Sequence, residues 1–196
     1  MDIYPENLNI LLDDLHNAGS IKSPTISAVS ASFECGTAIT VDLVIDPDAK
    51  QIEQVRFRTN GCGYMTAAGE LVARSFNGRR LAAIGGSIDA ELSDLMNEAI
   101  GSIPIERDHC QTTAVEAIKK ALASYRAKAA SEYNGESPLV CSCYGIDEEG
   151  VLATIKREQV VELNRFLKYS RAGSGCGSCR MVIEDMIAAH NDEFAA

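Results

Sequence analysis

Several features of other protein classes are absent from this sequence of 196 residues. No apolar run approaches the roughly 20 residues that a membrane-spanning helix needs. The first residues, from Met1 to Pro5, lack the basic group with which a signal peptide begins. Basic side chains are fewer than acidic ones, 18 against 28, and no basic face is apparent, which argues against nucleic acid as a partner. We therefore expect a cytoplasmic protein that binds neither a membrane nor a nucleic acid.

The composition is that of a globular protein without internal repeats or low-complexity tracts. Hydrophobic residues make up 46% of the chain, enough to bury a core. The length allows one or two domains. Residues 131–138 are polar and contain Gly135 and Pro138, a pattern typical of a linker. We expect a first domain over residues 1–130, a linker over 131–138 and a second domain over 139–196.

The pattern of residues 1–130 predicts an α+β fold, with a three-stranded antiparallel sheet packed against helices. Leu8, Leu11, Leu12 and Leu15 have helical spacing, which predicts a helix that ends at Gly19. Alternating polar and apolar residues predict three strands joined as a meander. These strands are expected over 26–34, 37–46 and 52–59, and further helices over 64–77, 89–100 and 111–128.

Residues 139–196 predict a small all-helical domain. Its helices are expected over 147–157, 161–169 and 180–190. A domain of roughly 60 residues buries proportionally little apolar surface, so a bound metal centre would contribute substantially to its fold.

The chain has seven cysteines, and in a reducing compartment neighbouring thiols are more often metal ligands or reactive groups than disulfides. Four of them form two tight pairs: Cys141 with Cys143, and Cys176 with Cys179. Two such pairs complete the four-sulfur shell of a zinc ion or a 2Fe-2S cluster, and spacing alone leaves both open. Gly173, Gly175 and Gly177 predict positive φ angles that turn backbone amides toward a negatively charged group.

The other cysteines stand singly. Cys35 and Cys62 lie in glycine-flanked turns, and Cys110 follows His109 at the predicted start of a helix, where the macrodipole favours thiolate. The three could converge at one end of the sheet and leave a fourth, replaceable ligand place, which would make a cluster labile. His109 is a candidate for that place, or else orients or protonates the site. The alternative is that all three cysteines are buried and act only as small hydrophobic residues.

The motifs around these cysteines resemble known ones. Glu34-Cys35-Gly36, Thr59-Asn60-Gly61-Cys62-Gly63 and His109-Cys110, with His16-Asn17-Ala18-Gly19, resemble the NifU/IscU family of iron-sulfur cluster assembly scaffolds. Val140-Cys141-Ser142-Cys143-Tyr144-Gly145 and Gly173-Ser174-Gly175-Cys176-Gly177-Ser178-Cys179 are similar to the ferredoxin-like domain of NifU and to bacterioferritin-associated ferredoxin. Together the two resemblances cover nearly the whole chain.

The resemblance implies a scaffold that is not an enzyme. It implies that Cys35, Cys62 and Cys110, with His109 beside them, carry a transient iron-sulfur cluster or an iron or zinc ion. It implies that Cys141, Cys143, Cys176 and Cys179 hold a permanent 2Fe-2S cluster that supplies electrons. The implied partners are a PLP-dependent cysteine desulfurase that delivers persulfide sulfur, recipient apo iron-sulfur proteins, an electron donor and a second copy of the chain in a homodimer.

The sequence departs from the family pattern at three places. Thr37 stands where the family usually has an aspartate linked to cluster lability, so we expect a longer-lived transient cluster. Residues 103–107 replace the chaperone-recognition segment of IscU-type members, and the third cluster-binding domain of full-length NifU has no counterpart up to Ala196. Two other functions remain open. An electron carrier would leave the three single cysteines unexplained, and a zinc-stabilised interaction protein would have no redox chemistry.

Overall fold

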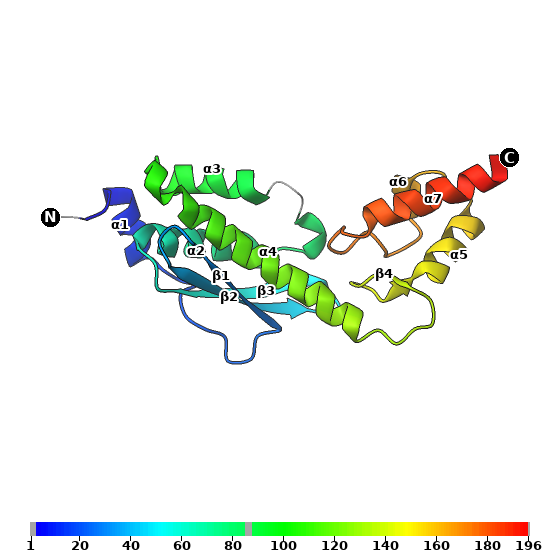
Figure 1. Ribbon diagram of the computed structural model, residues 1–196, viewed down its shortest axis with the longest axis horizontal. Coiled ribbons are helices and arrows are strands. Elements are labelled where there is room, and N and C mark those ends of the chain that lie inside the picture. The colour runs from blue at the N-terminus through cyan, green and yellow to red at the C-terminus, as the bar shows by residue number, and fades with distance from the viewer. Residues whose placement is uncertain (1–2, 85–87, 196) are drawn as a thin grey trace. The chain divides into compact units, whose positions relative to one another are not determined.

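The computed structural model describes residues 3–84 and 88–195. The chain forms two compact units (Figure 1). The first consists of Met1–Arg79 and Gly86–Tyr125, and the second of Arg80–Gly85 and Arg126–Ala196. No helix among the described residues combines the length and the apolar composition that crossing a membrane requires.

The first unit contains the predicted antiparallel meander. Its strands are β1 (Ile26–Ala31), β2 (Ala38–Asp46) and β3 (Gln51–Thr59), in the order β1-β2-β3. Val41 pairs with Ala28 on one side and with Phe57 on the other, and the register shifts between Val44 and Ile45. The apolar residues of the predicted alternation on β2 are buried: Ile39, Val41, Leu43 and Ile45. The period-two pattern therefore predicted this sheet correctly.

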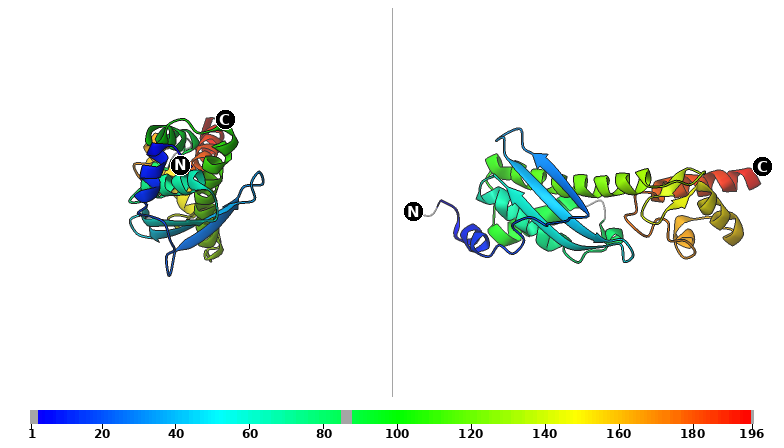
Figure 2. Two further views of the ribbon diagram at one scale, coloured as in Figure 1. Left: turned by 90° about the vertical axis from the view of Figure 1, so that its left-hand side faces the viewer. Right: turned by 90° about the horizontal axis from the view of Figure 1, so that it is seen from below.

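Helices cover one face of this sheet (Figure 2). They are α1 (Glu6–Asp13), α2 (Gly63–Phe76), α3 (Ile88–Ile100) and α4 (Asp108–Ser131, of which residues 126–131 belong to the second unit), with a short 3-10 turn at Ile105–Arg107. A further 3-10 turn, Leu81–Ala83, belongs to the second unit. Gly69 brings α2 close to β3, because a Cβ at this position would lie 2.4 Å from the ring of Phe57. The helices predicted over 64–77, 89–100 and 111–128 are thus present, and α4 begins earlier than expected.

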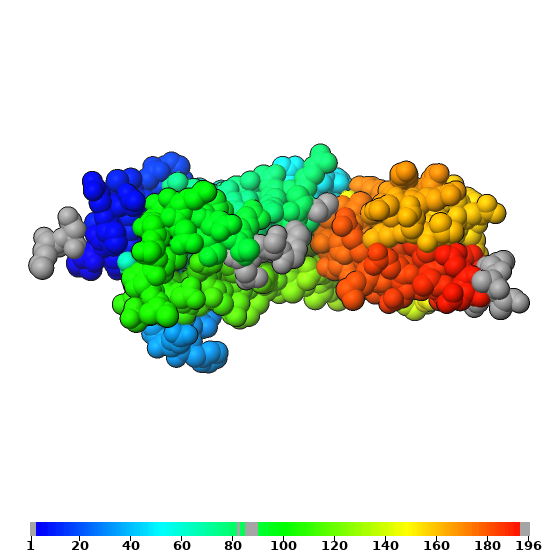
Figure 3. Space-filling model, turned by 90° about the horizontal axis from the view of Figure 1, so that it is seen from above, coloured from blue at the N-terminus to red at the C-terminus, as the bar shows by residue number. Residues whose placement is uncertain are grey.

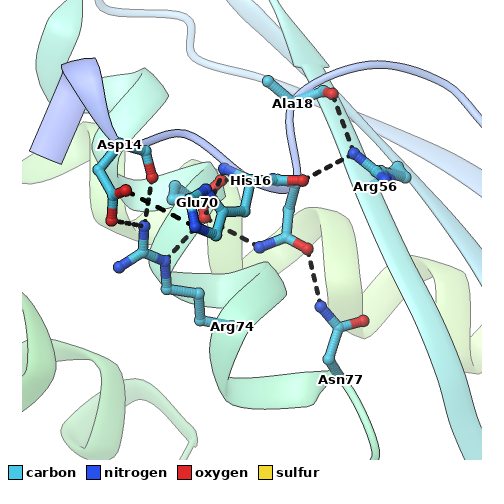
Figure 4. Close-up of polar contacts among 8 residues, drawn as sticks. Asp14, His16, Ala18, Arg56, Glu70, Arg74 and Asn77 are labelled. Carbon is cyan, nitrogen blue, oxygen red and sulfur yellow. Dashed lines mark hydrogen bonds and ion pairs between the residues drawn. The ribbon is translucent and has the colours of Figure 1, made fainter.

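The predicted end of the first helix at Gly19 is wrong. The helix ends at Asp13, and the loop after it donates backbone N–H groups to the carboxylate of Glu70, from His16 at 3.2 Å and Asn17 at 2.9 Å (Figure 4). Glu70 has no exposed surface, and it also accepts a bond of 2.7 Å from Arg74. A buried carboxylate needs such partners, and a continued helix would have used these amides internally.

The second unit is not all-helical as predicted. Besides α5 (Glu148–Glu158), α6 (Leu163–Phe166) and α7 (Arg180–Ala195), it has a small antiparallel sheet of β4 (Leu139–Cys141) and β5 (Ile146–Asp147). Gly145, with φ of 63°, makes the reversal between the two strands possible. The helix expected over 161–169 shortens to α6. Strands this short have too few alternating residues to be recognised from sequence.

The core of the second unit is small and includes cysteines. Its buried aliphatic and aromatic side chains come from α5, α6, α7 and the α5–α6 connection: Val151, Ile155, Val160, Phe166, Ile183 and Ile187. Cys141, Cys143 and Cys179 are buried in the same cluster. The thiols are therefore part of the packing that holds this unit together.

Candidate metal centres

Three of the four side chains predicted at the first site come from different elements of the first unit. Cys35 lies in the loop between β1 and β2, Cys62 precedes α2 as its N-cap, and Cys110 lies in the first turn of α4. The Sγ atoms of Cys62 and Cys110 are 3.9 Å apart, and His109 Nε2 lies 3.1 Å from Cys35 Sγ. The fold thus brings together residues that are distant in the sequence. Their role as ligands stays a prediction.

The three thiols differ in exposure. Cys35 is exposed, Cys62 is partly buried, and Cys110 is only 1% exposed. The loop that carries Cys35 stands out from the body of the first unit and is drawn in light blue in Figure 3. A reagent or partner in solution therefore meets Cys35 before the other two.

Cys35 is surrounded by hydrogen-bonding groups. The hydroxyl of Thr37 lies 3.0 Å from its sulfur. The side chain and backbone of Thr37, with weaker help from Ser32 and His109, lower the pKa of Cys35 to about 6 against a small opposing effect of burial. Cys35 is therefore largely thiolate at neutral pH. Thr37 thus contacts the cysteine directly, which sequence reasoning had not foreseen.

The expectation that the helix start favours a Cys110 thiolate is wrong. Burial, with smaller contributions from the neighbouring Cys62, raises the pKa of Cys110 to about 12. A helix terminus contributes on the order of 1 kcal/mol, whereas full burial can shift a pKa by several units. Desolvation therefore outweighs the macrodipole here. The sequence located the helix start but not the face of α4 on which the thiol lies.

His109 links Cys35 to a residue that sequence reasoning had not assigned a role. While its Nε2 faces Cys35, its Nδ1 lies 3.1 Å from Glu34 Oε2, without the alignment of a hydrogen bond. The His109 side chain is 9% exposed and that of Glu34 is 72% exposed. Adjacency of Glu34 to Cys35 was the only signal in the sequence. The contact itself requires the β1–β2 loop to fold onto α4.

The four cysteines of the second unit line one cavity of about 120 Å³, together with Gly175 and Gly177. Their thiols interact in a row, Cys179 with Cys141, Cys141 with Cys143, and Cys143 with Cys176. Donation from its neighbours lowers the pKa of Cys141, and donation to two neighbours raises the pKa of Cys143.

The glycine loop beside this cavity only partly follows its predicted conformation. Gly173 and Gly177 have φ of 82° and 77°, as expected, but Gly175 does not have a positive φ. Gly175 is needed for space instead, because a Cβ there would lie 2.7 Å from Cys143 Cβ and 2.9 Å from its Sγ. The backbone N–H of Cys176 donates to Cys143 Sγ at 3.4 Å. An amide directed at sulfur is favourable for a negatively charged thiolate.

The donor chemistry of this cavity fits a metal centre. Four cysteine sulfurs are the ligand set of both a 2Fe-2S cluster and a structural zinc ion, and metal binding would replace the protons that the thiols share. Across residues 3–84 and 88–195, no group of three or more His, Cys, Asp or Glu side chains has the geometry to hold one metal ion as it stands.

Comparison with known proteins identifies two regions of the chain. Residues 4–132 match the NifU-like N terminal domain, and residues 139–189 match the BFD-like [2Fe-2S] binding domain. The crystal structure of a NifU-like protein (N-terminal) from Brucella abortus has a TM-score of 0.51 and 16% identity, and covers 64% of this chain and 96% of that one. At this identity, the likeness supports the fold alone.

Curated relatives agree with this assignment. The nitrogen fixation protein NifU of Nostoc sp. is 26% identical over 98% of this chain and 66% of its own length, and that of Azospirillum brasilense is 27% identical over 88% and 55%. The iron-sulfur cluster assembly scaffold protein IscU of Aquifex aeolicus is 26% identical over 75% and 83%. The chain thus spans less than two thirds of the length of these NifU proteins. Because the first match covers well over half of it, the chain belongs to the family of the NifU-like N terminal domain.

Proposed function

We propose that this protein is a scaffold for the assembly of iron-sulfur clusters. A transient cluster is built on Cys35, Cys62 and Cys110 from iron and desulfurase-derived sulfur, and is then passed to apoproteins. A 2Fe-2S cluster resides in the second of two domains. The observation that carries this proposal is that one chain contains two unlike cysteine sites. At the first site the cysteines range from exposed to buried, and at the second site three of the four cysteines belong to a small core.

The geometry of the first site suits a cluster that is cargo. Cys62 and Cys110 are anchored at the starts of α2 and α4, so the fold fixes two of the sulfurs. Cys35 lies on an exposed loop instead. A site with two fixed thiolates and one on a loop allows both loading and release. His109 beside Cys35 supplies a further donor atom or a proton.

The second site suits a resident cofactor. Cys141, Cys143, Cys176 and Cys179 would hold a 2Fe-2S cluster, which when bound supplies or accepts one electron at a time. The chain's own contribution is to exclude water with the surrounding core and to direct the Cys176 amide at Cys143. In this proposal the protein acts as a scaffold and not as an enzyme. The match of residues 139–189 to a [2Fe-2S] binding domain favours this cluster over zinc.

The test is to quantify iron and sulfide anaerobically, with visible absorption, before and after reconstitution with a cysteine desulfurase, L-cysteine and ferrous iron. We expect one cluster at isolation and a second that appears on reconstitution and transfers to an apo-ferredoxin. Cys35→Ala should lose the second cluster and keep the first. Ser23→Ala, a change in an exposed loop of the same unit, serves as the control.

Two results would contradict the proposal. If nothing is gained beyond the first cluster, the electron-carrier function explains the protein better. If the isolated protein is colourless and contains zinc, the second site is structural and the protein is a zinc-stabilised interaction module.

A further inference from the structure

We propose that Glu34 is a positioning residue for sulfur delivery, which holds the His109 ring toward Cys35 and so makes Cys35 the first of the three thiols to accept sulfane sulfur. This inference rests on the proposed scaffold function, because it concerns the order of events at the same site. It assigns a role to Glu34 and an order to the three cysteines, neither of which follows from their sequence motifs.

Access to the three sulfurs supports this order. A persulfide on a partner or on a small molecule must bring its terminal sulfur within bonding distance of the accepting thiol. Cys35 is exposed, whereas Cys110 is buried and Cys62 is partly buried beside it. A groove of about 410 Å³ adjoins the site and is lined by Glu34, His109 and Asp108, among others. A donor can therefore approach Cys35 and His109 from solvent.

Both nitrogen atoms of the His109 ring lie close to side chains of the β1–β2 loop. Nε2 lies 3.1 Å from Cys35 Sγ, and Nδ1 lies 3.1 Å from Glu34 Oε2. A flipped or rotated ring would lose the contact with the sulfur. Because the His109 side chain is 9% exposed, water does not compete freely for Nδ1, and Glu34 is the carboxylate beside it. Glu34 precedes Cys35 directly, so the same loop positions the nucleophile and the group that orients its partner.

The chemistry that this arrangement performs is a transfer of sulfur without net redox change. The Cys35 sulfur attacks the terminal sulfur of a donor persulfide, R–S–SH. A new S–S bond forms at Cys35 Sγ, the S–S bond of the donor breaks, and its electron pair leaves with the donor as R–S⁻. Because Cys35 is largely thiolate, no proton has to be removed before the attack, and the products are Cys35–S–SH and R–S⁻. During the attack His109 Nε2 lies beside the Cys35 sulfur, and Glu34 holds the ring in that orientation.

The experiment uses all 196 residues of the chain, freed of metal at the first site, and glutathione persulfide as the donor in a single turnover. The products are trapped by alkylation, and the persulfide on each cysteine is quantified by peptide mass spectrometry over time. We expect Cys35 to be labelled at least about tenfold faster than Cys62 or Cys110. Glu34→Gln should slow labelling of Cys35 about three- to tenfold and raise the share on Cys62, while Glu34→Asp should recover part of the rate.

Two controls separate positioning from a structural effect. Glu53→Gln removes an exposed carboxylate on β3 and should change nothing. In a His109→Gln background, Glu34→Gln should have no additional effect, because a residue that acts through another is non-additive with it. The thermal unfolding midpoint should be unchanged by Glu34→Gln, which shows that a slower rate does not come from a disrupted fold.

The proposal is overturned if Cys62 or Cys110 is labelled first, if Glu34→Gln reacts like the wild type, or if its effect persists undiminished without His109. Reconstitution with inorganic sulfide distinguishes this failure from failure of the scaffold function. If a transferable cluster still forms from ferrous iron and sulfide, only the order of sulfur acceptance is wrong. If no second cluster forms by that route either, the scaffold function itself is wrong.

Discussion

The two groups of cysteines lie in surroundings of opposite character. In the first unit only Cys110 is buried, and the core around it is built from aliphatic and aromatic side chains such as Phe57, Met65 and Ile118. In the second unit three of the four cysteines belong to the core itself. The first unit can therefore fold without a bound metal. In the second unit, thiols occupy core positions that a larger domain would fill with further apolar side chains.

Polar contacts reinforce this difference. In the first unit Glu70 joins the loop after α1 to α2, and Asn77 joins Asn17 to the N–H of Val55 on β3 (Figure 4). These bonds fix the loop between α1 and β1 against α2 and β3, and Cys62 lies at the start of that same helix. In the second unit, the thiols that line the cavity take the place of such a polar network. We infer that protein contacts alone hold the first site in place, whereas the second site needs its bound ligand to become stable.

The largest effect is expected when a core cysteine of the second unit is replaced. Cys141→Ser should abolish the proposed resident cluster, because a hydroxyl is a poor substitute for a thiolate ligand and Cys141 is 2% exposed among the thiols that line the cavity. The second unit should then lose most of its stability, since metal binding free energy contributes to folding. Iron and sulfide per chain and circular dichroism on heating measure both effects.

Ser142→Ala, at the adjacent position, is the matched control and should keep the cluster. If Cys141→Ser keeps its cluster, the second site does not depend on this ligand. The proposed difference between the two sites would then be wrong.

The next largest effect is expected in the first unit, at Glu70. Glu70→Gln should lower the free energy of unfolding by about 3 kcal/mol, because it leaves Arg74 and two backbone N–H groups without their charged acceptor. Burial alone would raise the pKa of Glu70, but its hydrogen bonds outweigh this and lower it. The stabilisation is therefore present above the unfolded pKa of about 4.3 and disappears as pH falls through the folded pKa.

Urea unfolding of the wild type and Glu70→Gln at pH 7 and at decreasing pH measures this prediction. The two proteins should converge in acid, and Glu53→Gln should match the wild type throughout. A difference that grows as the pH falls would have the wrong sign for a carboxylate with a lowered pKa.

A smaller effect distinguishes the glycines of the two sites. Gly175→Ala should cost about 2 kcal/mol and reduce cluster content, because the added methyl group collides with Cys143. Gly36→Ala should cost about 1 kcal/mol through its positive φ of 68°, since no atom lies within 4 Å of the added group. Denaturant unfolding and iron content of both variants test the comparison. Equal iron loss in the two would show that crowding of Cys143 is not what matters.

The smallest effect concerns the thiol of Cys35. Thr37→Val removes the largest contribution to its lowered pKa, so the pH midpoint of its alkylation by iodoacetamide should rise from about 6 toward the ordinary value of 9.0. Thr40→Val, on β2 nearby, should leave the midpoint unchanged. A midpoint that stays near 6 without the Thr37 hydroxyl would assign the low pKa to the loop backbone instead. In a loaded scaffold, Thr37→Asp should shorten the lifetime of the transient cluster.

Local patterns predicted those parts of the fold that local forces decide. Alternation along β2 and β3 and the apolar stripe of α2 each follow from one stretch of chain, so they were predicted correctly. The end of α1 was not, because Glu70, more than fifty residues away, takes the amides of that loop. The hairpin of β4 and β5 was missed because two or three residues carry no detectable period.

By itself, the sequence determined the cysteine motifs, their glycine neighbours and thus the family, because ligand identity and spacing are covalent properties of the chain. Tertiary structure decided how the sites differ chemically. Burial of Cys110, exposure of Cys35 and the contact of Glu34 with His109 depend on elements that meet across the fold, such as Cys35 and His109, which are 74 residues apart. Desolvation and hydrogen bonding act through space, so these properties become readable only once the chain is folded.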